Sequence, residues 1–285
     1  MSGDLIITVA PCGAETMRSH NPAVPYTPDE IAAEARRCFD AGARMVHVHA
    51  RWDDGTPTQD AGRYRDTVAA IRAAAPEMIV QVSTGGAVGM APAERLGSLE
   101  AGPDMATLTC GTVNFGQGVF ENPAPLMLEF ARAQLARGVR PELEIFDLGH
   151  LDNARWLIGK APLEGPQHYD LVLGVPGGAS GTPRNVLTLA DRLPADGSTW
   201  SATGIGRSFL PVVTTALAAG GHVRCGFEDQ VEVAVGTLAS SNAELVERVA
   251  AIAALLGRSP ASPARAREIL RLSAAAASLR PRSGR

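Results

Sequence analysis

Short apolar runs rich in β-branched residues recur along the chain, and each is followed by a longer segment with helical periodicity. Eight of these runs predict strands, at Leu5–Val9, Met45–His49, Met78–Val82, Met105–Thr109, Glu142–Phe146, Leu171–Val175, Thr199–Thr203 and His222–Phe227. Strands that alternate with helical patterns of about 10–15 residues are typical of a parallel sheet.

The segments between these runs have apolar positions at helical spacing. They predict helices at 27–40, Ala61–Ala74, Ala91–Leu99, Pro123–Arg137, Asp152–Ile158, Pro183–Leu193, Phe209–Ala219 and Ala243–Leu256. The first helix has a clear start signal, with Thr27 as N-cap and Pro28 at the first helical position. Eight strand–helix units in 285 residues predict a closed (β/α)8 barrel, a fold that typically takes about 250 residues. A doubly wound α/β sheet is the alternative, but no GxGxxG motif follows the first strand.

No linker divides the chain, so residues 1–272 are expected to form one barrel domain. A short helical pattern at Pro263–Leu272 ends this domain. Residues 273–285 are rich in Ala, Ser and Arg and are expected to form a frayed C-terminal tail.

Composition narrows the class of protein. Hydrophobic residues make up 45% of the chain, which is typical of a globular protein and not of a disordered one. A net charge of -4 argues against a nucleic-acid partner, and no apolar run reaches the roughly 18 residues of a membrane span. The four cysteines are far apart and form no CxxC pair, which favours the reducing cytoplasm and excludes a disulfide scaffold.

Lysine is almost absent, and this bears on the chemistry. Only one of the 26 basic residues is a lysine, Lys160, and it lies in a polar stretch that predicts a surface loop. A Schiff-base enzyme needs an amine on a rigid element of its site, so this chemistry is not expected here.

A His-Val-His sequence marks the end of the second predicted strand. In a (β/α)8 barrel the active site lies at the C-terminal ends of the strands. His47 and His49 share one face of their strand, so both rings should point into the barrel mouth. Two converging imidazoles suit half of a zinc site, whereas the alternative is a pair of ordinary core or surface histidines.

Glu228 is the candidate for a third metal ligand. It follows the eighth predicted strand, and it shares strand parity with Arg224 and Gly226 if the strand stays regular. Gly226 would allow a ligand or a neighbouring backbone to approach closely. The alternative is that Glu228 is a solvated loop carboxylate. His222 begins this strand and should lie at the opposite end of the barrel.

Two glycine-rich strand ends, at residues 83–86 and 204–208, each precede a predicted helix. Exposed backbone amides at such places bind phosphate or carboxylate groups, so Gly85 and Gly86 are candidate substrate-binding residues. A tight turn with a helix cap explains the same pattern equally well.

Several blocks of sequence together resemble one family. ITVAPCGAET, AGARMVHVHAR, QVSTGGAVGM, PELEIFDLGH, GIGRSFLP and GGHVRCGFED are similar to the β-keto acid cleavage enzymes, whose best-known activity is 3-keto-5-aminohexanoate cleavage. The resemblance extends to about Leu272. It implies a zinc-dependent (β/α)8 barrel that forms a homotetramer. It further implies an enzyme that converts a β-keto acid and acetyl-CoA into acetoacetate and a new CoA thioester.

The resemblance also implies roles for individual residues. The positions that match the metal ligands are His47, His49 and Glu228. Ser83 and Thr107 match residues that bind the substrate carboxylate, and Glu144, Arg224 and Asp229 match charged catalytic groups. Glu15 matches a residue that contacts the distal end of the substrate. The chain departs from the family pattern at Cys12 and at 17–20, in a loop that shapes the substrate pocket.

These roles agree with the chemistry that the residue types allow. Cleavage of a β-keto acid needs an electron sink at the ketone oxygen, and a metal supplies one where no lysine is suitable. Asp229 is the expected base, because its strand parity is opposite to that of Glu228, and Arg224 balances its charge. Glu15 should attract a cationic substrate, unless Arg18 or Arg51 neutralises it.

Two other functions fit parts of the pattern. Amidohydrolase-type hydrolases are also barrels with an HxH pair, but they carry it on the first strand and add histidines at later strand ends. A catalytically silent barrel that only binds a CoA ester or an acidic metabolite would need no bound zinc. Metal content and dependence on acetyl-CoA distinguish these alternatives.

Overall fold

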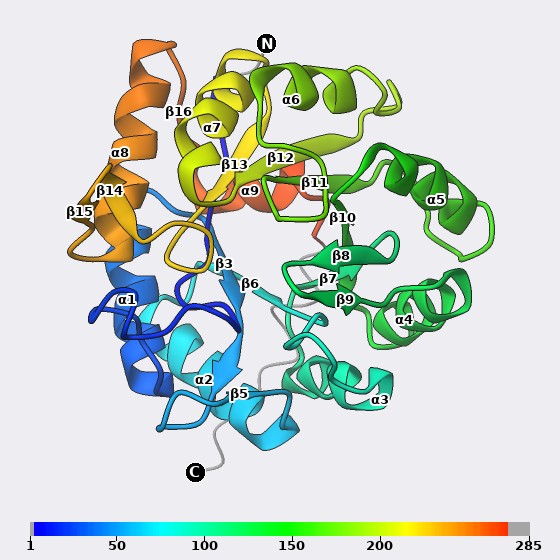
Figure 1. The fold of residues 1–285 in the computed structure, drawn as a ribbon, viewed down its shortest axis with the longest axis horizontal. Coiled ribbons are helices and arrows are strands. Elements are labelled where there is room, and N and C mark those ends of the chain that lie inside the picture. Colours follow the sequence, from blue (N-terminus) through cyan, green and yellow to red (C-terminus); the bar gives the residue numbers. More distant parts are fainter. Residues whose placement is uncertain (1–2, 273–285) are drawn as a thin grey trace.

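Eight parallel strands close into a barrel in the computed structural model, which describes residues 3–272 (Figure 1). In order around the barrel they are β2 (Ile7–Val9), β3 (Met45–Val48), β6 (Ile79–Val82), β7 (Met105–Thr109), β10 (Arg140–Ile145), β11 (His168–Leu173), β12 (Thr199–Gly204) and β13 (His222–Cys225). The pairing of β13 with β2 closes the ring. The predicted (β/α)8 barrel is therefore confirmed, and a doubly wound sheet is excluded. The tail predicted at 273–285 lies outside the described residues.

Helices surround the barrel between successive strands (Figure 1). They are α1 (Pro28–Ala41), α2 (Ala61–Ala74), α4 (Ala124–Ala136), α5 (Leu148–Ile158), α6 (Pro183–Ala190), α7 (Phe209–Ala218) and α8 (Asn242–Leu255). The start predicted for α1 is confirmed, since the Thr27 side chain accepts from the Glu30 amide and the Glu30 carboxylate accepts from the Thr27 amide. The segment predicted as one helix at Ala91–Leu99 is instead α3 (Pro92–Arg95) followed by the 3-10 helix η1 (Leu96–Ala101).

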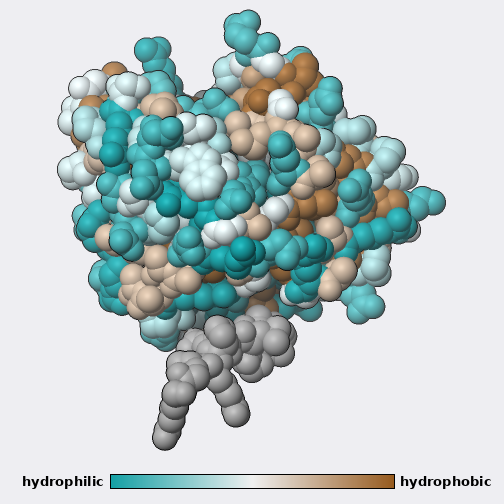
Figure 2. All heavy atoms as spheres, turned by 90° about the horizontal axis from the view of Figure 1, so that it is seen from below, coloured by the Kyte–Doolittle hydropathy of each residue, from teal (hydrophilic) through white to brown (hydrophobic). Residues whose placement is uncertain are grey.

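Loops and hairpins build up the C-terminal end of the barrel. Three two-stranded hairpins were not predicted, namely β4–β5 (Ala50–Arg51 and Pro57–Thr58), β8–β9 (Val113–Phe115 and Gly118–Phe120) and β14–β15 (Glu232–Ala234 and Thr237–Leu238). The short 3-10 helix η2 (Gly206–Ser208) follows β12. In the side view of Figure 2, raised groups of residues border a hollow at the top of the molecule.

Apolar side chains of the strands face the surrounding helices, and many polar side chains face the interior of the barrel. Outward residues such as Ile7, Val46 and Leu143 pack with the helices in one large core. The inward residues of β11 include His168 and Asp170, and this explains an error in the prediction. The strand predicted at Leu171–Val175 begins at His168, because buried polar residues hide its first half from a hydrophobicity pattern.

A further helix closes the N-terminal end of the barrel. Side chains of α9 (Pro263–Ile269) and Leu270 pack against Met45 and Met105, which begin β3 and β7, and against Ile6, which directly precedes β2. Beside this floor, β1 (Asp4–Leu5) pairs in parallel with β16 (Ser259–Pro260). His222 lies at this end, as predicted, where its Nδ1 accepts from the Ile6 amide at 3.1 Å.

The four cysteines are free and buried. Lys160 is exposed in a turn after α5, as predicted. None of the helices in the described part of the chain has the length and apolar character that crossing a bilayer requires.

The turn after β13 differs from the prediction in a way that matters for the site. β13 ends at Cys225 and not at Phe227, because Gly226 adopts a φ of 140°. A Cβ atom at Gly226 would lie 2.3 Å from the Ala10 carbonyl oxygen, so the neighbouring backbone requires glycine here. The predicted close approach at Gly226 is thus confirmed, but the predicted strand parity of Glu228 and Asp229 is wrong.

We expect Gly226→Ala to reduce the free energy of unfolding by about 3 kcal/mol or more, through strained backbone and overpacking against Ala10. Gly236→Ala is the matched control, since Gly236 has a φ of 76° with no heavy atom within 4 Å of the added Cβ. This control should lose only about 1 kcal/mol from backbone strain. Denaturant unfolding of both variants measures the difference, and equal losses would contradict the packing argument.

Candidate metal and substrate site

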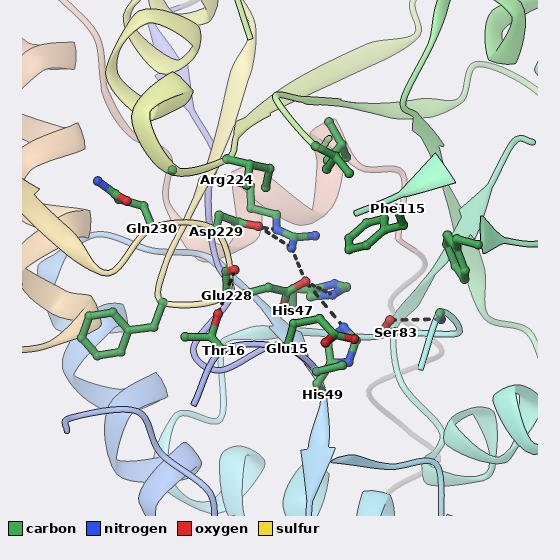
Figure 3. Close-up of a pocket in the computed structure, with 18 of the residues that line it drawn as sticks. Glu15, Thr16, His47, His49, Ser83, Phe115, Arg224, Glu228, Asp229 and Gln230 are labelled. Atoms are coloured by element: carbon green, nitrogen blue, oxygen red, sulfur yellow. Dashed lines mark hydrogen bonds and ion pairs between the residues drawn. The ribbon is translucent and has the colours of Figure 1, made fainter. Parts of the chain in front are cut away.

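One cavity of about 450 Å³ opens at the C-terminal ends of the barrel strands. Most of the residues predicted for the site line it, and Figure 3 shows how several of them converge. They are Glu15, His47, His49, Ser83, Gly85, Gly86, Glu144, Arg224, Glu228 and Asp229. Thr107 is not among the lining residues, because it lies below the loop at 83–86.

The structure brings the three predicted metal ligands together. The rings of His47 and His49 are 5.2 Å apart, and Glu228 reaches them from the turn after β13 (Figure 3). Glu228 Oε1 lies 3.7 Å from His47 Nε2 and 3.5 Å from His49 Nε2. One possible ligand atom from each residue lies within 4.8 Å of the others. His47 lies on β3, the second strand of the barrel, and His49 directly follows this strand, so the pair is not on the first strand as in amidohydrolases.

The chemistry of these residues fits a zinc ion. His47 Nε2 and Glu228 Oε2 are buried without a hydrogen-bond partner in the described chain, an arrangement that is costly unless something else binds there. Burial and the nearby Arg224 lower the pKa of His47 to about 3, so its ring is neutral, as a metal ligand must be. Two imidazoles and one carboxylate are the protein ligands of many catalytic zinc sites.

Arg224 holds both carboxylates of the turn. Its Nη2 donates to Glu228 Oε1 at 2.5 Å and to Asp229 Oδ1 at 2.9 Å, and its Nε donates to Asp229 Oδ2 at 3.0 Å. Burial would raise the pKa of Glu228, but the guanidinium of Arg224 holds it well below its usual value. Asp229 is more affected by burial, which raises its pKa to about 7 although Arg224 opposes this.

Glu144 approaches the same guanidinium from β10. Its Oε1 lies 3.9 Å from Arg224 Nη1, and its Oε2 accepts from the Thr109 hydroxyl at 2.6 Å. Burial raises the pKa of Glu144 to about 8, although Arg224 and Thr109 favour the ionised form. At neutral pH the cluster therefore pairs an ionised Glu228 with a Glu144 that is mostly protonated.

A short loop after β6 supplies polar groups on the opposite side of the metal candidates. Ser83 Oγ accepts from the Gly85 amide at 3.1 Å, which leaves the hydroxyl hydrogen free to be donated into the cavity. The Thr84 amide donates to Thr107 Oγ1, and the Thr84 hydroxyl donates to the Thr107 carbonyl at 2.7 Å. Thr107 thus supports this loop from below.

Glu15 lies at the edge of the cavity with an exposed side chain. The alternative in which Arg18 or Arg51 neutralises it is wrong. Arg18 forms a bidentate pair with Glu30, and Arg51 is fully buried. Arg51 donates to the carbonyl oxygens of Gly13 and Thr16, on either side of Glu15. Arg51 therefore shapes this turn without neutralising its carboxylate.

Sequence reasoning missed two parts of the site. One is an apolar wall of the cavity, made by Phe115, Phe120, Phe146, Val172, Val175 and Ile205. Its aromatic hairpin could have been found from the Gly-Gln-Gly turn between two apolar pairs at 113–120.

The second missed part of the site is Gln81, whose Oε1 lies 2.7 Å from His47 Nδ1. Gln81 shares its strand face with Ser83, a signal that was available in the sequence.

Comparisons with known proteins agree with this arrangement. A family model described as beta-keto acid cleavage enzyme matches residues 4–272. The 3-keto-5-aminohexanoate cleavage enzyme of Fusobacterium nucleatum subsp. nucleatum is 49% identical over 95% of this chain and 99% of its own length. The 3-oxoadipate:acetyl-CoA acetyltransferase of Cupriavidus necator is 40% identical over 95% of this chain and 96% of its own length.

A solved structure shows the same fold. The binary complex of ObcA with oxaloacetate superposes with a TM-score of 0.74 at 22% identity, covering 88% of this chain and 68% of that chain. The family match spans nearly all of the described residues, and both curated relatives match over almost their whole length. The chain is therefore an enzyme of the β-keto acid cleavage family.

Proposed function

We propose that this enzyme is zinc-dependent and that it converts a β-keto acid and acetyl-CoA into acetoacetate and a new acyl-CoA thioester. The main support is the convergence of His47, His49 and Glu228, with unpartnered buried ligand atoms, beside the Arg224–Asp229 pair. When bound, a zinc ion supplies a Lewis acid for the ketone oxygen of the β-keto acid. Acetyl-CoA is part of the name of the Cupriavidus necator relative.

In the proposed reaction, the acetyl group moves from CoA to C2 of the β-keto acid, and the original acyl group of the β-keto acid moves to CoA. Asp229 removes a proton from C2 of the β-keto acid, and C2 then bonds to the carbonyl carbon of acetyl-CoA while the CoA thiolate leaves. The thiolate attacks the original ketone carbon, and the bond between this carbon and C2 breaks. The electron pair returns to C2, which recovers its proton from Asp229. The products are acetoacetate and the new thioester.

The other residues of the cavity hold these groups in place. Arg224 orients the Asp229 carboxylate through two hydrogen bonds, and Glu144 contacts Arg224 from the other side. Ser83 can donate its hydroxyl hydrogen to the substrate carboxylate, with Gly85, Gly86 and the supporting Thr107 shaping this subsite. The homotetramer that the family resemblance implies and the cytoplasmic location that the cysteine pattern favours stay predictions.

A panel of β-keto acids, assayed with and without acetyl-CoA, tests this function. We expect acetoacetate and a new CoA thioester, detected by mass spectrometry, only when acetyl-CoA is present. A chelator should abolish turnover, and added zinc should restore it. His49→Ala should lose most of its metal and activity together. Full metal content in both His47→Ala and His49→Ala would rule out the proposed ligands.

Asp229→Asn tests the proposed base. This variant should keep its zinc, because Glu228 and both histidines are unchanged. Turnover should fall roughly 10²- to 10⁴-fold, the usual contribution of a general base. Metal analysis and steady-state kinetics are measured on the same preparation, and normal turnover of a zinc-loaded variant would assign proton transfer to another group.

Glu15→Gln tests the choice of substrate. Because Glu15 lies at the cavity edge without an ion pair in the described chain, it should favour a β-keto acid with an amino or trimethylammonio group at its distal end. Wild type should prefer cationic over neutral and anionic substrates of equal length by kcat/KM, and the variant should lose most of this preference. An unchanged ranking would show that Glu15 does not select the substrate.

A further inference from the structure

Gln81 lies directly beside the candidate metal site but does not line the cavity. It is fully buried on β6, and the register of the barrel places it next to His47 on β3. Its Oε1 lies 2.7 Å from His47 Nδ1, within the buried interior. This hydrogen bond links two inward-facing side chains of adjacent strands and has no water-exposed alternative.

The hydrogen bond determines which nitrogen of His47 is available. An amide oxygen can only accept, so His47 Nδ1 must carry the hydrogen and Nε2 must keep its lone pair. Nε2 is the atom that faces Glu228, at 3.7 Å, and it is buried without a hydrogen-bond partner in residues 3–272. The ring of His49 has no comparable hydrogen-bond partner in residues 3–272, where its Nε2 lies 3.5 Å from Glu228 Oε1.

We propose that Gln81 is a positioning residue for the metal, which fixes the tautomer and the ring orientation of His47. The inference rests on the zinc site of the proposed function. Hydrogen bonds from ligating histidines to a second group commonly contribute roughly 10- to 100-fold to metal affinity. Here the partner is a neutral amide, so it orients the ligand without adding a negative charge beside Glu228 and Asp229.

The contribution of Gln81 to zinc affinity is measured by comparing Gln81→Met with wild type. Methionine has a similar length but lacks the amide oxygen that accepts the hydrogen bond from His47. Gln134→Met is the matched control, since Gln134 is equally buried and its amide donates to the Thr107 carbonyl, away from the metal candidates. Competition with a chromophoric chelator gives the dissociation constants, and thermal unfolding of the metal-free proteins checks the fold. We expect Gln81→Met to bind zinc roughly 10- to 100-fold more weakly than wild type, and Gln134→Met to match wild type.

The outcomes separate this inference from the proposed function. If wild type binds no stoichiometric zinc, the metal site itself is wrong. If wild type binds zinc and Gln81→Met binds it as tightly as Gln134→Met, only the role of Gln81 is overturned.

A measurement on wild type keeps the test decisive if Gln81→Met does not fold. Nuclear magnetic resonance of zinc-loaded protein with nitrogen-labelled histidine should show a ligand that is coordinated through Nε2 and carries a slowly exchanging proton on Nδ1. Zinc-bound histidines that all lack such a proton would overturn the proposal.

Discussion

The charge of one buried arginine organises the mouth of this barrel. Arg224 contacts Glu144, Glu228 and Asp229, which would otherwise be three carboxylates in a poorly solvated space. Removing only the cation from a buried ion cluster commonly costs about 3–5 kcal/mol, because the remaining charges are left unpaired. The same guanidinium helps to keep His47 neutral and Glu228 ionised. The ionisation states that a metal site needs therefore depend on a residue that cannot itself bind the metal.

Much of the fold and the centre of the site could be predicted because they follow local rules. The eight barrel strands alternate with helices, and outward apolar residues mark them in the sequence. His47 and His49 could be placed together because β3 is regular up to Val48 and His49 directly follows it. One error falls where polar residues face inward. β11 begins three residues before its predicted start, since His168 and Asp170 look like a solvated segment although they are buried.

The rest of the site depends on features that a strand pattern does not contain. Glu228 and Asp229 both point toward Arg224. Gly226 ends the strand, so the side chains after it no longer alternate between the two faces of the sheet. Gln81 looks unremarkable in sequence and gains its position from the pairing of β3 with β6. The Glu15 carboxylate is not neutralised by Arg51, because Arg51 donates its hydrogen bonds to backbone carbonyl oxygens instead. Register, turn geometry and competition for hydrogen-bond partners are properties of the folded chain.

The way in which the barrel closes has a consequence for the order in which the chain can fold during synthesis. β2 pairs with β13, and β1 pairs with β16. Both strand pairings join segments that are more than 200 residues apart in the sequence. The floor is complete only when α9 and Leu270 reach the starts of the first strands. A nascent chain on the ribosome therefore exposes the unpaired edge of β2 until β13 has emerged. Exposed strand edges promote association with other chains, so the incomplete barrel is most open to such association before β13 has emerged.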